Sequence, residues 1–317
     1  MKQNMKQKLY RLEPVFEERL WGTQRLREKY GYETDLDNIA EVYNVCAMPG
    51  HLDNVVSGTG LFLSEFYREH RELFGCDTEE MPVEVCMAHS NSYLSVQVHP
   101  DDAYAFLHEG SRGRPEGGVV IEADGDCRVV LGHHAKTREE FKELAEKGEW
   151  DRLLRYIETK PDQYTQTPAW TLHAFCPNAL VVAFSTNADI TYRLYDYERL
   201  DPKTGRLRQL HTQQVIDHVT VPDDTIQAFY PEVRREQGCE ICQYHDEPGA
   251  FTCGRIKVSG TGRYETDDFM FYVCVDGAGT INRVPVKGGE TLFAPKGFGV
   301  AVFEGELDLM YVTYRNK

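Results

Sequence analysis

The chain has 317 residues, of which 41% are hydrophobic and 27% are charged, so it can bury a substantial core. It has 35 basic and 51 acidic residues, and its formal net charge of −16 disfavours binding to nucleic acid and to anionic membranes. The sequence contains no apolar run of the length that a membrane helix needs and none typical of a signal peptide, so we expect a cytoplasmic protein that binds neither nucleic acid nor membrane.

Helical periodicity is confined mainly to two segments. The spacing of apolar residues predicts helices near 61–75 and over 137–157. Thr137, with Glu140 three residues later, forms a capping-box pattern that marks the start of the second helix. Short apolar or alternating runs predict strands elsewhere, at 93–99, 118–121, 127–131, 179–185, 190–195, 251–258, 269–275, 290–294 and 307–314.

The polar stretch 227–238 divides these strands into a long first part and a short second part. Many short strands separated by turn residues are typical of barrels and sandwiches. We therefore predict a mainly β protein of two β-barrels, one in residues 1–226 with the helical insertions and a smaller one in residues 239–317. The segment 275–297 has glycine turns but no histidine, so we expect no metal in the second barrel.

The cysteines give no sign of a disulfide framework. There are nine, irregularly spaced, in a chain large enough to fold without disulfides, and we interpret most of them as reduced and buried. Cys239 and Cys242 have CxxC spacing, but no second pair follows them. A structural zinc site there would therefore lack half of its ligands.

The stretch 93–102, Tyr-Leu-Ser-Val-Gln-Val-His-Pro-Asp-Asp, is the most informative part of the sequence. Side chains alternate between the two faces of a strand, so Gln97 and His99 share one face and point into the same barrel interior. Pro100 ends the strand because it cannot donate a ladder hydrogen bond. Two groups that can bind a metal therefore lie close together in the predicted first barrel.

Two further residues can complete a metal site. His173 lies on a later run that can face the same cavity, and Glu116 supplies a carboxylate. Two imidazoles, one carboxylate and one amide oxygen suit zinc, with manganese, iron or cobalt as alternatives. Positions left to water can be taken by substrate oxygens, as in a catalytic metal site. On spacing alone, a Gln-x-His pair on a strand is also compatible with ordinary polar side chains and no metal.

Several motifs together carry a resemblance to a known family. They are Pro-Val-Phe and Arg-Leu-Trp-Gly within 14–22, the Gln-x-His motif at 94–102, Gly-His-His-Ala-Lys-Thr at 132–137, Thr-Tyr-Arg-Leu-Tyr-Asp-Tyr at 191–197 and Gly-Arg-Leu-Arg-Gln-Leu-His at 205–211. With them the chain resembles, nearly end to end, the short bacterial form of type I mannose-6-phosphate isomerase. That family consists of zinc-dependent enzymes of the cupin fold. The resemblance implies two jelly-roll barrels, one zinc ion per chain and, as its ligands, Gln97, His99, Glu116 and His173.

The resemblance also implies a reaction and a set of substrate contacts. The reaction is the interconversion of mannose 6-phosphate and fructose 6-phosphate through a cis-enediol, with Arg193 as the active-site arginine. Arg114 stands where the family usually has a lysine and keeps a cation there. Trp21 and Lys136, within matching motifs, are further candidates for substrate binding. The partner is then a small sugar phosphate, and a monomer and a homodimer both remain open.

Some residues depart from the family pattern inside the expected pocket. Cys86 stands where a lysine is usual, and Ala183 stands where a glutamate is usual. These changes remove a cation and a candidate acid or base, and His89 is a candidate replacement base. Two alternatives therefore accompany the isomerase interpretation: a metal enzyme of the same fold that acts on another sugar, and a catalytically silent sugar-binding cupin.

Overall fold

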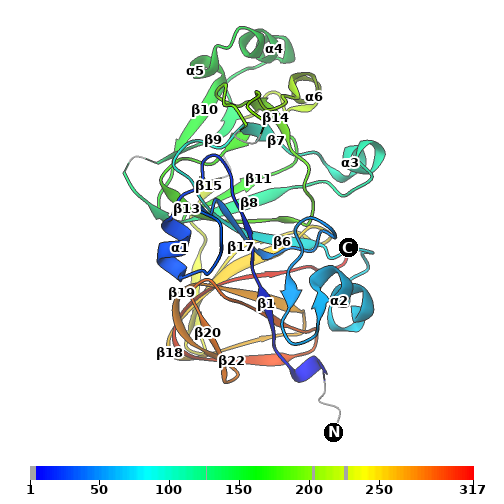
Figure 1. The fold of residues 1–317 in the computed structure, drawn as a ribbon, viewed down its shortest axis with the longest axis vertical. Helices are drawn as coiled ribbons and strands as arrows, with labels where there is room; N and C mark the ends of the chain where they lie inside the picture. The colour runs from blue at the N-terminus through cyan, green and yellow to red at the C-terminus, as the bar shows by residue number, and fades with distance from the viewer. Residues whose placement is uncertain (1–4, 126, 202–203, 225–227) are drawn as a thin grey trace.

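The computed structural model describes residues 5–125, 127–201, 204–224 and 228–317, which fold into three antiparallel sheets. The expectation of a mainly β protein is confirmed. In Figure 1 the C-terminal strands gather at one end of the molecule, and helices α4 (Arg138–Glu146) and α5 (Trp150–Leu153) lie at the other. All nine predicted strand segments overlap strands of the structure. The division into two barrels, at 1–226 and 239–317, stays a prediction.

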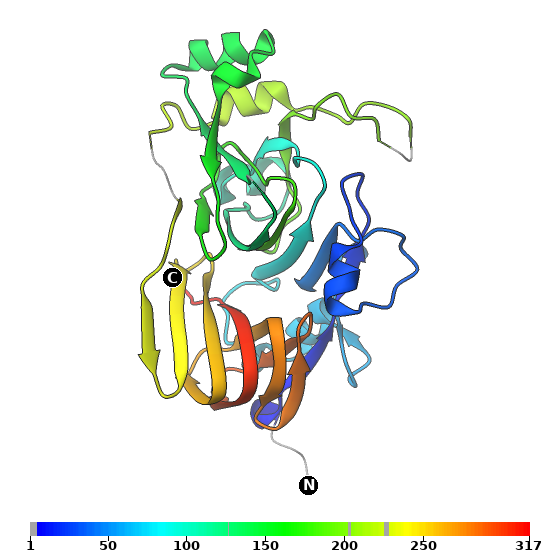
Figure 2. The same ribbon diagram turned by 90° about the vertical axis from the view of Figure 1, so that its left-hand side faces the viewer.

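The largest sheet has ten strands among the described residues and contains most of the C-terminal part of the chain. Two of its strands, each of 15 residues, pair along their whole lengths, from Thr252 opposite Thr313 to Thr266 opposite Gly299. Figure 2 shows this sheet across the lower half of the molecule. In spatial order the strands are β16 (Val233–Glu236), β17 (Cys239–Asp246), β18 (Thr252–Thr266), β22 (Gly299–Thr313), β19 (Met270–Ile281), β21 (Thr291–Ala294), β1 (Tyr10–Glu13), β4 (Val55–Val56) and β5 (Leu61–Phe62), with β20 (Val284–Lys287) paired to β19.

The other two sheets lie between the largest sheet and the helical end (Figure 1). The seven-stranded sheet has the order β15 (Ala228–Phe229), β11 (Tyr164–Thr167), β8 (Glu116–Ala123), β13 (Ala179–Thr186), β6 (Val83–His89), β3 (Glu41–Val45) and β2 (Val15–Glu17). The five-stranded sheet has the order β10 (Leu154–Glu158), β9 (Arg128–His133), β12 (His173–Ala174), β7 (Val96–Val98) and β14 (Tyr192–Tyr195). Strands β6 and β13 are buried along nearly their whole lengths, which explains their almost continuous apolar sequences.

The helices are short. Thr137 caps α4 as expected, since its hydroxyl accepts a hydrogen bond from the backbone N–H of Glu140 at 3.2 Å. The predicted helix 137–157 ends early, because β10 begins at Leu154. The remaining helices are α1 (Arg25–Tyr30), α2 (Leu63–Glu69), α3 (Asp102–His108) and α6 (Thr212–His218), with 3₁₀ turns η1 (Met5–Gln7) and η2 (Arg71–Leu73). None of the described helices is long and apolar enough to cross a membrane.

An aromatic core fixes the N-terminal helical insertion onto the largest sheet. Phe66 of α2 and Phe74, just after η2, are buried and contact Phe293 of β21. The rings of Phe74 and Phe293 stack with their centroids 4.5 Å apart. Buried aromatic side chains contribute large apolar areas, so this contact joins segments that are more than 200 residues apart in the sequence.

Candidate metal centre and substrate cavity

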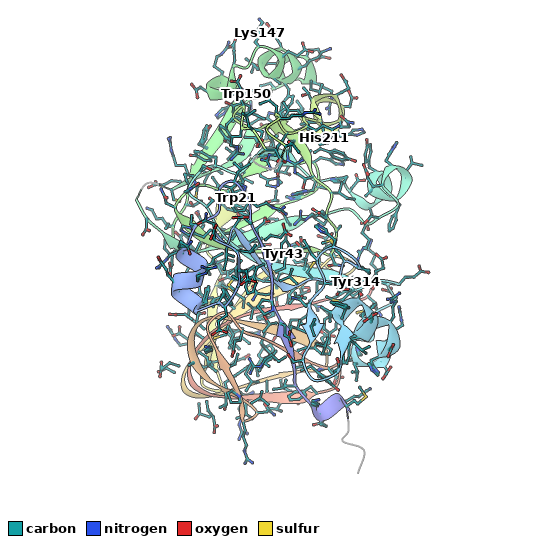
Figure 3. The ribbon with its side chains drawn as sticks, viewed as in Figure 1. Trp21, Tyr43, Lys147, Trp150, His211 and Tyr314 are labelled. Atoms are coloured by element: carbon teal, nitrogen blue, oxygen red, sulfur yellow. The ribbon has the colours of Figure 1, made fainter. Side chains whose placement is uncertain are left out.

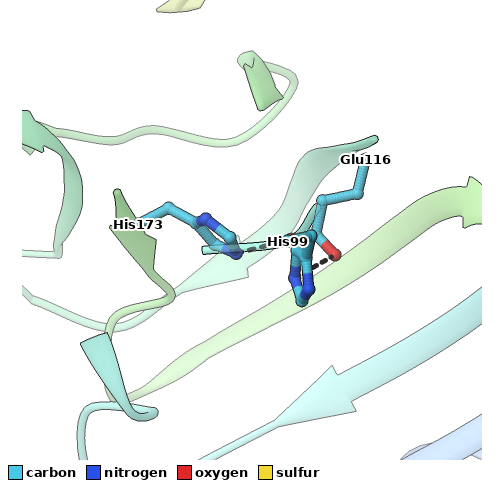
Figure 4. Close-up of side chains that lie close together, drawn as sticks. All are labelled: His99, Glu116 and His173. Carbon is cyan, nitrogen blue, oxygen red and sulfur yellow. Dashed lines mark ion pairs between the residues drawn. The ribbon is translucent and has the colours of Figure 1, made fainter. Parts of the chain in front are cut away.

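Three buried side chains that can bind a metal converge where the five-stranded and seven-stranded sheets meet. His99 directly follows β7, His173 begins β12 and Glu116 begins β8. Each is at most 4% exposed, and their candidate ligand atoms all lie within 4.8 Å of one another. Figure 4 shows both imidazoles turned toward the Glu116 carboxylate. The sheet register explains the proximity, because His173 pairs directly with Gln97, two residues before His99.

Both histidine rings are held from behind by backbone carbonyl groups. Nδ1 of His99 donates to the carbonyl of Ile190 at 2.7 Å, and Nδ1 of His173 donates to the carbonyl of Thr171 at 2.9 Å. Because a carbonyl oxygen accepts, these contacts place a proton on Nδ1 of each ring and direct Nε2 inward. Such outer contacts are typical of metal-binding histidines, because they fix the tautomer and the ring orientation.

The inner atoms surround a small space and lack the partners that a closed hydrogen-bond network would give them. His99 Nε2 lies 3.3 Å from Glu116 Oε2, and His173 Nε2 lies 3.1 Å from Glu116 Oε1. The buried His173 Nε2 nevertheless has no well-aligned hydrogen bond among the described residues. An unpaired buried nitrogen is costly, so a cation at this position would satisfy it.

Charge supports the same interpretation. Burial lowers the pKa of His99, which favours the neutral imidazole that a metal requires. Burial alone would raise the pKa of Glu116, but positive charge and donated hydrogen bonds from His99 and His173 in their protonated form hold it well below its usual range. A bound cation would supply the same positive charge when both rings are neutral. The side-chain nitrogen of Gln97 is placed 3.5 Å from His99 Nε2, and a half-turn of the amide would direct its oxygen inward instead. The set of nitrogen and oxygen donors therefore fits a divalent cation such as zinc.

A cavity of about 290 Å³ opens beside this centre and reaches Gln97. Its wall includes Trp21 and Tyr43, which Figure 3 places in the middle of the molecule. Four arginines also line it, namely Arg19, Arg114, Arg193 and Arg208. The cavity is close to the lower end of the range of roughly 300–1,000 Å³ that is typical of small-molecule sites. The arginines supply the local positive charge that an anionic ligand of this acidic protein needs.

Three of the four arginines are already neutralised. Arg19 Nε lies 3.0 Å from a Glu41 oxygen, Arg114 Nη2 lies 2.8 Å from a Glu84 oxygen, and Arg208 Nε lies 2.7 Å from an Asp196 oxygen. These pairs hold their guanidinium groups in the cavity wall.

Arg193 differs from the other three. Among the described residues no carboxylate forms an ion pair with it, and its buried Nε has no hydrogen-bond partner. Burial, followed by the neighbouring Arg208, lowers its pKa, although an arginine remains charged. Arg193 is therefore the cavity cation with the most unused capacity to bind an anion.

Next to Arg114, but outside the lining of the cavity, residues on β6, β13 and β8 form aligned rows. Glu84 and Glu116 are both opposite Ser185 in the register of the sheet, so one row carries two carboxyl groups. The Ser185 hydroxyl donates to Glu84 at 3.2 Å. Burial raises the pKa of Glu84 to about 7, although Arg114 acts in the opposite direction. The next row on the same face of the sheet, two residues along, consists only of small residues, Cys86, Ala183 and Gly118, and none of these lines the cavity.

Of the other candidate residues, some line the cavity and others lie outside it. Trp21 and Arg114 line the cavity with Gln97 and Arg193, whereas Lys136 does not and instead pairs with Asp224 at 3.0 Å on the surface. His89 is also outside the cavity lining, and its Nδ1 hydrogen-bonds with the Thr23 hydroxyl at 2.8 Å.

Trp170, three residues before His173, turns away from the cavity. Its Nε1 donates to Asp101 at 3.1 Å, and its ring stacks on His218.

Two residues near the cavity escape the sequence analysis. His51 lines the cavity from a turn before β4, and no periodicity or motif distinguishes it. Glu84 does have a signal, because a carboxylate within the apolar run 83–88 is unusual in a buried strand. A charged residue in such a run implies a buried partner, here Arg114.

Comparison with known proteins identifies relatives over nearly the whole chain. No family model matches it. The chain is 36% identical over 309 residues to the protein named "Probable mannose-6-phosphate isomerase GmuF" of Bacillus subtilis, covering 94% of this chain and 97% of that protein. It is 33% identical over 313 residues to the mannose-6-phosphate isomerase of Streptococcus mutans, with the same coverage. The crystal structure of the mannose 6-phosphate isomerase from Bacillus subtilis superposes with a TM-score of 0.92 at 29% identity, covering 96% of this chain and 99% of that one.

Proposed function

This chain belongs to the mannose-6-phosphate isomerase family, and we propose that it is a zinc-dependent enzyme that interconverts mannose 6-phosphate and fructose 6-phosphate. The observation that carries the proposal is the buried cluster of His99, Glu116 and His173 beside a cavity with an unpaired Arg193. The nine cysteines, all free, suit the cytoplasm, where thiols stay reduced.

The metal would be held by Gln97, His99, Glu116 and His173. When bound, zinc supplies a Lewis acid for the negative charge that develops on the sugar oxygens as the C–H proton leaves. Only Glu116 offsets the charge of the ion, so the centre keeps the net positive charge that this role requires. The carbonyl groups of Ile190 and Thr171 keep both imidazoles in their ligand orientation throughout the reaction.

The reaction proposed here moves hydrogen within an open-chain sugar phosphate. The C2 proton of the aldose leaves, O1 gains a proton, and a cis-enediol forms. O2 then loses its proton, and C1 gains one to give the ketose. Arg193 binds either the phosphate or the developing enediolate. Arg114 contacts the substrate while it stays paired with Glu84, and Trp21 forms an apolar wall.

Elemental analysis combined with a coupled isomerase assay tests this function. We expect one zinc ion per chain, turnover of mannose 6-phosphate to fructose 6-phosphate, loss of turnover with a chelator and its return with added zinc. Bound metal without turnover of mannose 6-phosphate would contradict the proposed substrate. A panel of phosphorylated and free aldoses and ketoses then distinguishes an enzyme for another sugar from a silent binder.

Replacing Arg193 tests the anion site. An arginine-to-phosphate or arginine-to-enediolate contact contributes roughly 1.5–3 kcal/mol per hydrogen bond, so Arg193→Met is expected to lower kcat/KM about 100-fold. The matched control is Arg234→Met, on the exposed edge strand β16. Steady-state kinetics on zinc-loaded protein gives the result, and a change smaller than about threefold would show that Arg193 contacts neither group.

A further inference from the structure

Isomerisation needs a group that can accept and return a proton, and few groups in the cavity can do so. The carboxylic acids and histidines that line it are Glu41, His51 and Asp189. Glu41 is bound by Arg19 at 3.0 Å and also accepts from the Tyr43 hydroxyl at 3.4 Å. It is therefore already committed to the wall of the cavity, whereas His51 retains a free ring nitrogen.

His51 and Asp189 form a pair at the cavity edge. His51 Nε2 lies 3.1 Å from Asp189 Oδ2, and the other carboxylate oxygen, Oδ1, lies 4.0 Å from Arg114 Nη1. Arg114 thus orients the carboxylate from one side, and His51 contacts it from the other. Among the described residues nothing hydrogen-bonds to His51 Nδ1. Because a carboxylate oxygen accepts hydrogen bonds, the contact with Asp189 places the ring proton on Nε2 and leaves the Nδ1 lone pair available to accept a proton.

The side chains of His51 and Asp189 are 48% and 46% exposed, but the two segments that carry them are joined by buried contacts. The side chain of Asn187, two residues before Asp189, forms two hydrogen bonds with the backbone of Ala47. The Asn187 side-chain oxygen accepts from the Ala47 N–H at 3.0 Å, and the side-chain nitrogen donates to the Ala47 carbonyl at 3.1 Å. Ala47 opens the turn that carries His51, whose own N–H donates to the Met48 carbonyl. These contacts hold the two segments together with the histidine facing the cavity.

The pair is also connected to the metal centre. Asp189 precedes Ile190, whose carbonyl holds the ring of His99, and Gln97 lines the same cavity as His51. A sugar phosphate that fills a cavity of this size therefore lies against both His51 and the ligand side of the centre.

We propose that His51, oriented by Asp189, is the catalytic residue that transfers the proton between C2 and C1. This inference rests on the proposed function. The C2–H bond breaks, its proton goes to Nδ1 of His51, and the electron pair remains in the enediol. The proton then returns from Nδ1 to C1 as the C1–H bond forms, so the imidazole ends in its starting state. Asp189 is a positioning residue that stabilises the transient imidazolium.

The test compares three zinc-loaded variants with the wild type. In His51→Asn we expect kcat to fall about 100-fold or more with little change in KM, because general acid–base catalysis typically contributes 10²–10⁴-fold. His134→Asn, which alters an exposed histidine outside the cavity, serves as the matched control and should behave as wild type. In His51→Ala, added imidazole should raise kcat by at least about tenfold, and the zinc content should stay unchanged.

The outcomes separate the inference from the function on which it rests. If the wild type is active and His51→Asn stays within about threefold of it, the proton-transfer role is wrong and the isomerase function stands. A rise in KM with no imidazole rescue would also overturn the role, because His51 would then only contact the substrate. A wild type without isomerase activity overturns the proposed function itself.

Discussion

Glu116→Gln should abolish stable zinc binding and lower kcat/KM by more than about 100-fold. Loss of an outer contact to a metal ligand costs about 10–100-fold in affinity or activity, so loss of the charged ligand should cost more. Glutamine keeps the size of the side chain but removes the negative charge at the centre of the site. The two imidazoles would then face a neutral amide that cannot offset the charge of a divalent ion. Elemental analysis and titration of zinc into the metal-free variant measure the loss of binding.

A matched control lies on the same strand. Glu122, six residues along β8, pairs with Arg25 and Lys29 near the surface and does not line the cavity. Glu122→Gln should therefore keep a full complement of zinc and normal turnover. If Glu116→Gln also bound one zinc ion per chain and turned over normally, the His99, Glu116 and His173 cluster would not be the metal centre.

The sequence predicts half of this centre from local geometry alone. Gln97 and His99 are two residues apart on a strand, and a period of two places them on one face whatever the remainder of the fold is. Glu116 and His173 have no such local signal. Their proximity depends on the register of β12 against β7 and on the meeting of two sheets. From the sequence, only the resemblance to a family points to them.

Two further local patterns show how strand geometry acts on the sequence. Cys239 and Cys242 are three residues apart on β17, so their side chains point to opposite faces and enter different core clusters. The CxxC spacing on this strand therefore does not bring the two thiols together. The helix expected over 137–157 fails at its end because Leu154 and Ile157 also suit a strand. Pairing of β10 with β9 decides between the two structures.

The charges around the cavity are the least predictable part of the site. Cys86 and Ala183 indicate the loss of a cation and of a carboxylate, but the next row on the same face contains Glu84, which pairs with Arg114. Recognising that arrangement requires knowing which residues are opposite each other across β6 and β13. The position of His51 is equally hard to predict from the sequence. Hydrogen bonds from Asn187 hold the turn that brings His51 to Asp189.

The buried carboxyl of Glu84 should lower the free energy of unfolding as the pH rises. Its pKa is raised by burial from the ordinary value of 4.5 to about 7, so the folded state holds the proton more tightly than the unfolded state. Its contribution to stability is fully present below pH 4.5 and is lost as the pH rises to about 7. At about 1.4 kcal/mol per pKa unit, the loss amounts to roughly 3 kcal/mol.

The variant Glu84→Gln isolates this effect, because glutamine does not titrate and can still accept from Arg114. The free energy of unfolding of the wild type, minus that of the variant, should fall by about 3 kcal/mol between pH 4.5 and 7.5. Urea unfolding of the metal-free proteins at several pH values measures it. Glu122→Gln should change in the opposite sense, since hydrogen bonds from Lys29 and Arg25 outweigh burial and lower the pKa of Glu122. A constant difference for Glu84→Gln would mean that Arg114 fully compensates the burial, and the carboxylate would then be ionised throughout the working range of the enzyme.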